Sequence, residues 1–267
     1  MAGNAKTNKF MLSTATVMLG PLADLHALNP TEHSIGLVKN FQLTGEAQYT
    51  ELTQGIRNAV VMSVRTGEGL RTSCEVYEFT AKNLAFAAGL DASGTSYDVV
   101  DEWSALAAVA DDASTELTLA AATTAPIAVG DYIFLQKGQD DYVHVVKVGA
   151  IDITVPASPE ITPAAGFEVP AGMSFPIGTR VGRLKRVDIG TSVTQPDLAC
   201  KVTGILPKDN SPFTILLPKV KVTRGLGVSF ASDNFSNMPF EMQPYEMVMA
   251  DPFYSEYGQA QAVLLAR

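Results

Sequence analysis

Residues 40–55, NFQLTGEAQYTELTQG, alternate between apolar and polar side chains more strictly than any other stretch of the chain. Successive side chains of a β-strand point to opposite faces, so this pattern predicts a long strand with two chemically different faces. One face would carry Phe41, Leu43, Gly45, Ala47 and Tyr49, and the other would carry Gln42, Thr44, Glu46, Gln48 and Thr50. We expect this strand to run from about residue 37 to residue 54.

A second alternating stretch follows at 70–77, after a connector that is apolar at its centre. We interpret the two stretches as an extended hairpin whose arms of about 16 residues reach roughly 50 Å at about 3.3 Å per residue. Residues 56–66 are expected to form the connecting loop. Its apolar side chains would be costly to leave in water, namely Ile56, Val60, Val61, Met62 and Val64.

Residues 80–90, TAKNLAFAAGL, predict one short helix. Thr80 suits the N-cap, because its hydroxyl can accept a hydrogen bond from a free backbone N–H of the first turn. Gly89 suits the left-handed position at which many helices end. The remaining ordered stretches have the character of strands and turns, so we expect an all-β fold with this one short helix.

A change in composition near residue 103 marks an expected insertion. Short strand-like segments at 117–121, 129–138, 142–149 and 151–156 are separated by turn residues, as in a small barrel or sandwich. Longer strand-like segments then return, at 179–196, 199–205, 213–223, 226–232 and 239–247. We predict a β-sandwich core with an extended hairpin, interrupted by a small SH3-like β-barrel; the core would occupy 1–107 and 181–267 with a C-terminal extension, and the insertion 108–180.

The charge balance limits the partners of this chain. There are 28 Asp and Glu against 19 Lys and Arg, a net charge of −9. Tight nucleic-acid binding rests on neutralising phosphates, so this balance argues against it, although an acidic surface suits a protein that DNA slides past. The basic run of Arg180, Arg183, Lys185 and Arg186 would divide between two faces of a strand. For it we prefer contacts with acidic residues of a neighbouring subunit to contacts with nucleic acid.

Patterns typical of catalysis or metal binding are weak in this sequence. Cys74 and Cys200 lack the spacing of a zinc site and lie in strand-like stretches, which favours buried thiols over a disulfide. His26, His33 and His144 do not pair on one element. No nucleophile elbow, phosphate loop or zinc-binding His-Glu motif is found in the sequence. We therefore expect a protein that is not an enzyme, with no catalytic residue, no metal and no cofactor.

Two pairs of adjacent carboxylates, Asp111–Asp112 and Asp140–Asp141, fall in expected turns. Such pairs are commonly solvated, and a calcium site at an assembly contact is the alternative. Residues 10–19, FMLSTATVML, are interpreted as a first strand rather than a secretory signal, because three hydroxyl residues interrupt the apolar run. No stretch approaches the roughly 18 apolar residues that a membrane-spanning helix needs, so we expect no membrane partner.

Three stretches of the chain resemble the tail tube proteins, or major tail proteins, of long-tailed bacteriophages. They are SIGLVKNFQLTGEAQYTELTQG at 34–55, GEGLRTSCEVYEFTAKNLAFAAGL at 67–90 and FTILLPKVKVTRGLGVSFASDNFSNMPFEMQPYEM at 213–247. The resemblance covers about residues 35–90 and 187–250. The insertion at 108–180 and the C-terminal stretch DPFYSEYGQAQAVLLAR depart from it.

The resemblance implies a structural virion protein of the phage tail, made in the host cytoplasm. The subunit would assemble with itself into hexameric rings that stack as a tube for genome delivery into the host cell. Double-stranded DNA and the tape-measure protein would pass through the lumen. Tail terminator and baseplate proteins would meet the tube ends, and a sheath would surround the tube in a contractile tail. The alternative is another phage β-sandwich ring protein, such as a tail terminator or a capsid decoration protein.

The resemblance also implies roles for the two faces of the hairpin. The apolar face would pack on the sandwich core, while the polar face would line the lumen with Gln42, Thr44, Glu46, Gln48, Arg71, Ser73 and Glu75. A lumen of acidic and neutral polar residues would let DNA pass without adhesion. The connecting loop would dock onto the neighbouring ring through Ile56, Arg57, Asn58, Val60, Val61, Met62, Val64 and Arg65. The inserted barrel is expected to decorate the tube exterior.

Overall fold

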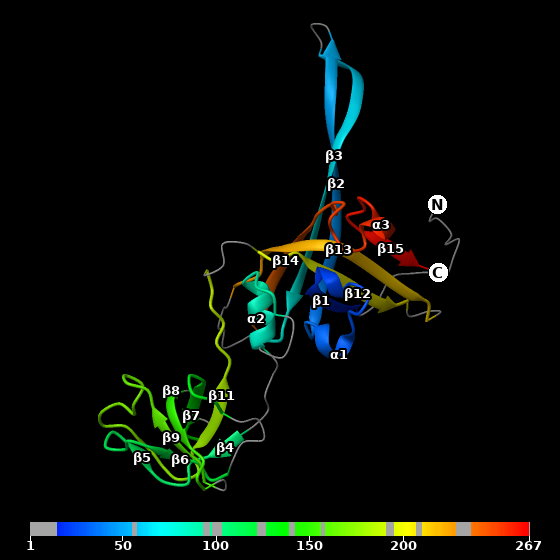
Figure 1. The fold of residues 1–267 in the computed structure, drawn as a ribbon. Coiled ribbons are helices and arrows are strands. Elements are labelled where there is room, and N and C mark those ends of the chain that lie inside the picture. Colours follow the sequence, from blue (N-terminus) through cyan, green and yellow to red (C-terminus); the bar gives the residue numbers. More distant parts are fainter. Residues whose placement is uncertain are drawn as a thin grey trace, which may run out of the picture. The chain divides into compact units, whose positions relative to one another are not determined.

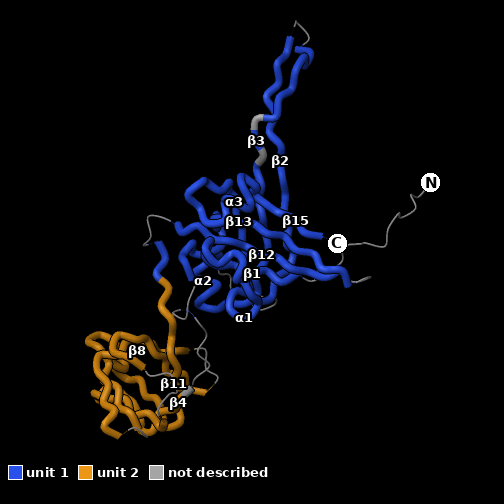
Figure 2. Tube along the Cα trace, turned by 45° about the vertical axis from the view of Figure 1, so that its right-hand side comes forward, with its two compact units in different colours: residues 1–97, 188–267 blue, residues 98–187 orange. Residues whose placement is uncertain are grey.

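The computed structural model of the chain describes residues 15–54, 58–92, 97, 103–121, 127–138, 142–155, 158–190, 195–206, 210–227 and 236–266. The chain divides into two units, with residues 1–97 and 188–267 in unit 1 and residues 98–187 in unit 2 (Figure 2). Unit 2 therefore interrupts unit 1 in the sequence. It begins earlier and ends later than the expected insertion at 108–180, because the strands at both of its ends pair within its own sheet.

Unit 1 is built on one antiparallel sheet of seven strands, in the order β1-β12-β13-β14-β3-β2, with β15 also paired to β13 (Figure 1). The predicted all-β fold class is confirmed. The strands are β1 (Ala15–Pro21), β2 (Val38–Gln54), β3 (Ala59–Val76), β12 (Leu198–Ile205), β13 (Pro212–Arg224), β14 (Met238–Pro244) and β15 (Val263–Ala266).

The long strand β13 joins the two halves of this sheet. Its first half pairs with β12 and β15, and its second half pairs with β14. Alternate residues of β14 are buried, as expected for a strand with one face on a core, and they are Met238, Phe240, Met242 and Pro244. Cys74 and Cys200 are buried free thiols, which confirms the prediction, and burial raises the pKa of Cys74 to about 12.

Helix α2 (Ala81–Ala87) is the helix that the sequence predicted. The Thr80 hydroxyl accepts a hydrogen bond from the backbone N–H of Asn83 at 3.1 Å, which satisfies a donor of the first turn. Gly89 has a φ of +74°, which only glycine adopts without strain. The segment between β1 and β2 contains the 3-10 helix η1 (Leu22–Asp24) and the helix α1 (Pro30–His33), and α3 (Tyr254–Tyr257) lies near the C-terminus.

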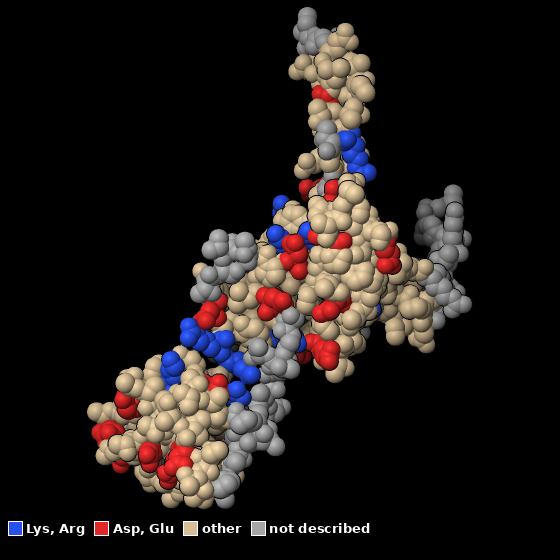
Figure 3. All heavy atoms as spheres, viewed as in Figure 1, with Lys and Arg blue, Asp and Glu red and all other residues tan. Residues whose placement is uncertain are grey.

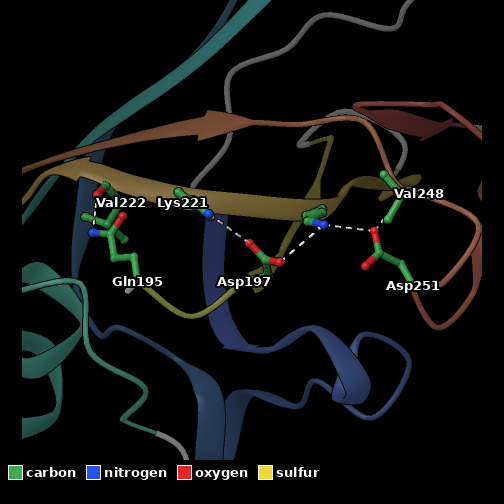
Figure 4. Close-up of polar contacts among 7 residues, drawn as sticks. Gln195, Asp197, Lys221, Val222, Val248 and Asp251 are labelled. Atoms are coloured by element: carbon green, nitrogen blue, oxygen red, sulfur yellow. Dashed lines mark hydrogen bonds and ion pairs between the residues drawn. The ribbon is translucent and has the colours of Figure 1, made fainter. Parts of the chain in front are cut away.

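A polar network ties the C-terminal segment to β13 (Figure 4). Lys219 Nζ lies 2.9 Å from Asp251 Oδ2 and 3.2 Å from Asp197 Oδ2, while the Lys221 ammonium lies 3.4 Å from Asp197 Oδ1. The backbone N–H of Val248 donates to Asp251 Oδ2 at 2.8 Å. Beside this network, Phe253 and Tyr257 pack on a buried cluster formed by Met18, Leu25, Leu28 and Ala199.

Unit 2 is a small closed barrel with a two-stranded ribbon. Its main sheet has the order β4-β11-β7-β8-β9-β6. The backbone N–H of Ala107 donates to the Thr118 carbonyl at 2.8 Å, and that of Ala120 donates to the Ala105 carbonyl at 2.7 Å. These bonds join the segments following β4 and β6, so the sheet closes on itself. The strands are β4 (Trp103–Ala105), β5 (Ala110–Asp111), β6 (Leu117–Thr118), β7 (Tyr132–Gln136), β8 (Val143–Asp152), β9 (Glu160–Pro163), β10 (Ser174–Phe175) and β11 (Arg180–Leu184).

The barrel has its own apolar core. One cluster of buried side chains fills it, comprising Leu106, Ala110, Leu117, Leu119, Ile133, Leu135, Val146, Val148, Ile161, Val169, Phe175 and Val181. Ribbon β5–β10 contributes Ala110 and Phe175 to this cluster. Because its core and its strand pairing are internal, unit 2 has what a separately folding module requires. Its SH3-like character stays a prediction.

Some predicted strands differ from those observed. Among its described residues, the segment at 179–196 forms a strand only over β11, and the segments at 142–149 and 151–156 belong to the single strand β8. Most of the segment at 226–232 lies outside the described residues, so that strand stays a prediction. Strand β15 was not predicted. Its residues, VLLA, do not alternate in polarity, and the strand forms by pairing Val263–Ala266 with Leu216–Phe213 of β13.

Candidate functional site

The hairpin of β2 and β3 extends far beyond the rest of unit 1 (Figure 1). We call its projecting part, residues 44–54 and 58–70, the arm. Every residue of β2 from Thr44 to Gln54 is exposed. A two-stranded ribbon with both faces in water is marginally stable by itself, so the arm has the properties of a segment that needs a partner.

The polar residues predicted to line a lumen lie on one face of the hairpin. Gln42 stands opposite Ser73, and Thr44 stands opposite Arg71. Residues directly opposite each other in an antiparallel pair project to the same side, so the predicted grouping of these residues on one face is confirmed. Glu46 and Gln48 follow on the same side, opposite Gly69 and Gly67. Their exposure to a lumen stays a prediction.

Glu75 differs from Glu46, because its carboxylate is already engaged at the base of the hairpin. The Tyr77 hydroxyl donates to Glu75 Oε2 at 2.9 Å, and Lys39 stands opposite Glu75 across the ladder. Hydrogen bonds from Asn40, Tyr77 and Asn237 hold the pKa of Glu75 below its ordinary value, with a smaller contribution from the Lys39 charge. Glu46, by contrast, is exposed on the arm.

The apolar face of β2 packs on unit 1 only near its base, which corrects the prediction that the whole face packs on the core. Phe41 and Leu43 are half-buried. Ala47 and Tyr49 are exposed, and Tyr49 has 59% of its surface accessible. The prediction was wrong for these residues because β14 pairs with β3 only over Thr72–Val76, so no described strand of unit 1 lies beside the arm.

The expected connecting loop at 56–66 is also corrected. Strand β3 begins at Ala59, so Val60, Val61, Met62, Val64 and Arg65 belong to the ladder and not to a loop. Asn58 lies in the turn with a φ of +45°. Ile56 and Arg57 lie outside the described residues. The predicted docking role requires apolar side chains that are accessible to a partner. The exposed fraction is 51% for Val60 and 60% for Val61, which meets that requirement.

The polar face of the hairpin becomes apolar in the distal arm, which we define as residues 49–54 and 58–65, beyond the register shift at Gln48. Leu52 stands opposite Met62, and Thr50 stands opposite Val64, on the side that carries Gln48 lower down. The ladder shifts register between Gln48 and Tyr49, because β3 contributes one extra residue there, and again between Leu52 and Thr53. Sequence reasoning missed Leu52, although it interrupts the polar positions of the alternation. Figure 3 shows that the distal arm carries few charged atoms.

Strand β2 also leaves a long edge of the sheet unpaired among the described strands. It is the last strand in the order, with β3 on one side and no strand on the other. Alternate residues of an edge strand turn their backbone N–H and C=O groups away from the paired neighbour, so β2 presents a row of such groups along this edge. Such an edge is a template for pairing with a strand of another chain. The hairpin therefore offers a backbone edge and an exposed apolar segment for association.

The other candidate residues have structural partners. Arg183 forms an ion pair with Asp131 at 3.0 Å within unit 2, and the expected contacts of the basic run with a neighbouring subunit stay a prediction. Asp111 accepts a hydrogen bond from the Ser114 hydroxyl at 2.8 Å, and Asp112 accepts one from the Gly172 N–H at 3.0 Å. Asp140 and Asp141 lie outside the described residues.

His26 and His33 are surface or hydrogen-bonded residues, as predicted, whereas the Nε2 atom of His144 is buried without a hydrogen-bond partner among the described residues. His26 Nε2 lies 3.1 Å from Glu256 Oε2, and His33 Nδ1 accepts a hydrogen bond from the Asn29 N–H at 3.3 Å. The ring of His144 stacks on Phe175, with 5.9 Å between the ring centroids. Over the described ranges, no group of three His, Cys, Asp or Glu side chains is arranged to hold a metal ion.

No helix of the described chain is long and apolar enough to cross a membrane. No protein-family model matches the chain, and no curated protein matches it at a significant level.

Proposed function

We propose that this chain is a tail tube subunit of a long-tailed bacteriophage, which assembles into stacked hexameric rings around a channel for genome delivery. The single observation that carries the proposal is the distal arm. It holds six large apolar side chains, each 46–63% exposed, on a ribbon that its own unit does not cover: Tyr49, Leu52, Val60, Val61, Met62 and Val64. A monomeric protein has little reason to keep such a segment in water.

The unpaired edge of β2 supports ring formation. Pairing this edge with a strand of a neighbouring subunit satisfies the free backbone groups and continues the sheet from one subunit to the next. Repeating the same contact around a rotation axis gives a closed ring. The polar face of the hairpin base then lines the channel, with Gln42, Thr44, Glu46 and Gln48 toward the passing DNA and tape-measure protein.

The charge of the chain fits this passive role. Its net charge of −9 provides no affinity for a polyanion. Arg71 is one basic residue among the predicted lumen residues, and acidic or neutral side chains make up the others. DNA that meets such a wall is not held by it. Unit 2 is proposed to decorate the tube exterior, and tail terminator, baseplate and, in a contractile tail, sheath proteins are the expected further partners.

Negative-stain electron microscopy of the purified protein tests this proposal. We expect rings or tubes at high concentration, or tubes when assembly is seeded by tail initiator complexes. Closed rings or trimers that never extend would favour a tail terminator or a capsid decoration protein instead. A protein that stays monomeric even when seeded would overturn the proposal.

A further inference from the structure

A cavity of about 430 Å³ lies between the start of β2, the end of β12 and the start of β13. Its floor includes Val202 and Ile215, which are cross-strand neighbours and almost fully buried. Ala15, Gly204 and Phe213 form the next row across β1, β12 and β13. Because Ala15 and Gly204 contribute little or no side chain, the space beside Phe213 stays open. We call this cavity the base groove.

The base groove is apolar and open to water at its rim. Ile205 lines the groove and is 57% exposed. Lys39 is the single charged residue among those lining it, and its ammonium lies 4.7 Å from the centre of the Tyr77 ring. An apolar group can therefore enter without removing an unpaired charge from water.

We propose that the base groove receives the distal arm of a second copy of this chain, a proposal that rests on the tail tube function above. The chain supplies both halves of the contact, because no described residue of the chain fills the groove and none covers the apolar side chains of the arm. The donor side chains are Leu52, Met62 and Val64, which share one face of the distal ladder.

The arm cannot fill the groove of its own subunit. Phe41 lines the groove and Leu52 lies eleven residues further along the same strand. At about 3.3 Å per residue, the two are roughly 35 Å apart. Donor and acceptor therefore lie at opposite ends of one ladder. A contact between two different surfaces of identical subunits is head-to-tail, and such contacts extend into open polymers when rotation does not close them.

The contact should be too small to hold a dimer. A stable interface buries about 1,600 Å², whereas three or four apolar side chains in a groove bury far less. The contact would hold only in a tube, where each subunit also has neighbours in its own ring. There each subunit inserts its arm into one copy and receives the arm of another in its groove. We therefore expect the arm and groove to be joined in assembled tubes and separate in the free subunit.

Disulfide cross-linking in assembled tubes tests the pairing. Three double variants each combine Ile205→Cys with one donor change, Leu52→Cys, Met62→Cys or Val64→Cys. We expect at least one to give a ladder of covalent multimers on a non-reducing gel after mild oxidation, because a disulfide requires Cα atoms within about 7 Å. A disulfide within one subunit is excluded, because the groove residue Phe41 and the arm residue Leu52 of the same strand are roughly 35 Å apart. Cys74 and Cys200 are buried and do not interfere.

The matched control replaces Ile205→Cys by Val248→Cys, which is similarly exposed at 54% on the same unit. This control should give no ladder. Tubes that form without a ladder in all three double variants would overturn the groove pairing and leave the proposed function standing. If no variant and no parent protein assembles, the proposed function itself is wrong.

Thiol labelling of the single variant Ile205→Cys gives a second readout. We expect fast alkylation in the free subunit and at least tenfold slower alkylation in tubes. Protection that is already complete in the free subunit would assign the groove to another segment of the same chain, and would overturn the proposal. Equal rates in subunit and tube would overturn it as well.

Discussion

At the scale of single residues, the best-defined electrostatic contacts hold the C-terminal segment. Burial opposes ionisation of Asp251, but the Val248 N–H and the Lys219 ammonium together keep its pKa below the ordinary value. Burial likewise opposes the charge on Lys219, while Asp251 and Asp197 raise its pKa. The Asp251 contribution to stability is therefore present above about pH 4 and lost as the pH falls through its folded pKa. The Lys219 contribution is lost only when the pH rises above about 10.

Replacing Asp251→Asn should lower the free energy of unfolding by about 1–2 kcal/mol at pH 7, because Lys219 loses one of two charged partners. The difference from the parent protein should shrink as the pH falls below about 4, where the parent also loses the Asp251 charge. Urea unfolding at pH 7 and pH 3 measures both effects. Asp24→Asn, at an exposed position in η1, is the control and should change stability by less than about 0.5 kcal/mol. A deficit that persists unchanged at pH 3 would contradict the electrostatic explanation.

Glu46 and Gln48 set the charge of the arm face that we assign to the lumen. The double change Glu46→Lys and Gln48→Lys makes the charge of each subunit more positive by three. Under our assignment of this arm face to the lumen, the added charge faces the channel. We expect tubes assembled with short duplex DNA to enclose it and protect it from nuclease, and we expect parent tubes to protect none. The control, Thr115→Lys with Glu116→Lys, adds the same charge to exposed positions of unit 2. Protection in the control, or none in the arm variant, would show that these residues do not face the lumen.

At the scale of elements, the hairpin combines two surfaces in one ladder. Near its base the face with Gln42 and Thr44 is polar, and beyond the register shift at Gln48 the same side carries Leu52, Met62 and Val64. One extra residue in β3 accompanies this change. A single element can therefore present polar groups at one level of an assembly and apolar groups at the next.

The double change Val60→Asp and Val61→Asp should leave the subunit folded and prevent ring stacking. Both side chains are at least half exposed, so the folded subunit loses little, whereas an assembled contact would have to bury two carboxylates. Sedimentation and electron microscopy should find rings or free subunits in place of tubes. Ile153→Asp with Val155→Asp makes the same change at equally exposed positions of unit 2 and should still form tubes. Tubes of normal length from the arm variant would rule out these residues as the inter-ring contact.

The features that the sequence predicted correctly depend on local patterns. Strict alternation defined β2, and the side chain of Thr80 with the backbone freedom of Gly89 defined α2. Residues 56–66 were predicted as a loop, because an extra residue near Val61 interrupts the period-two pattern where β3 is in fact a strand. The polar face was predicted, but its change to an apolar face was not. That change depends on how β3 is aligned with β2, which one strand alone does not reveal.

At the scale of the whole molecule, the chain combines two units that have separate cores and separate sheets. Pairing between β4 and β11 brings residues 103–105 beside residues 180–182, which are far apart in the sequence. No local sequence pattern indicates such pairing. The expected insertion at 108–180 was therefore shorter at both ends than the observed unit 2 at 98–187. The sheet of unit 1 contains no strand from 98–187.

Removing residues 98–187 and joining the chain with about eight Gly and Ser residues should leave unit 1 folded and able to assemble. A linker of this length costs little closure entropy, and unit 1 loses no strand. Circular dichroism and electron microscopy should find a folded β protein that forms tubes of smaller outer diameter. The excised unit, residues 98–187, should fold by itself as a companion control. An unfolded deletion variant beside a folded isolated barrel would show that unit 1 depends on the insertion.

The pairing of β4 with β11 also has an evolutionary consequence. Gly182 stands opposite Trp103, so the chain arrives at the barrel and departs from it through neighbouring strands. A gene segment with such adjacent ends can be gained, lost or exchanged in one recombination event, and the sheet of the recipient protein keeps its strand order. Under the proposed tail tube function, we expect related genes to differ most by the presence and identity of this segment, so that lineages with one kind of tube vary what its surface displays.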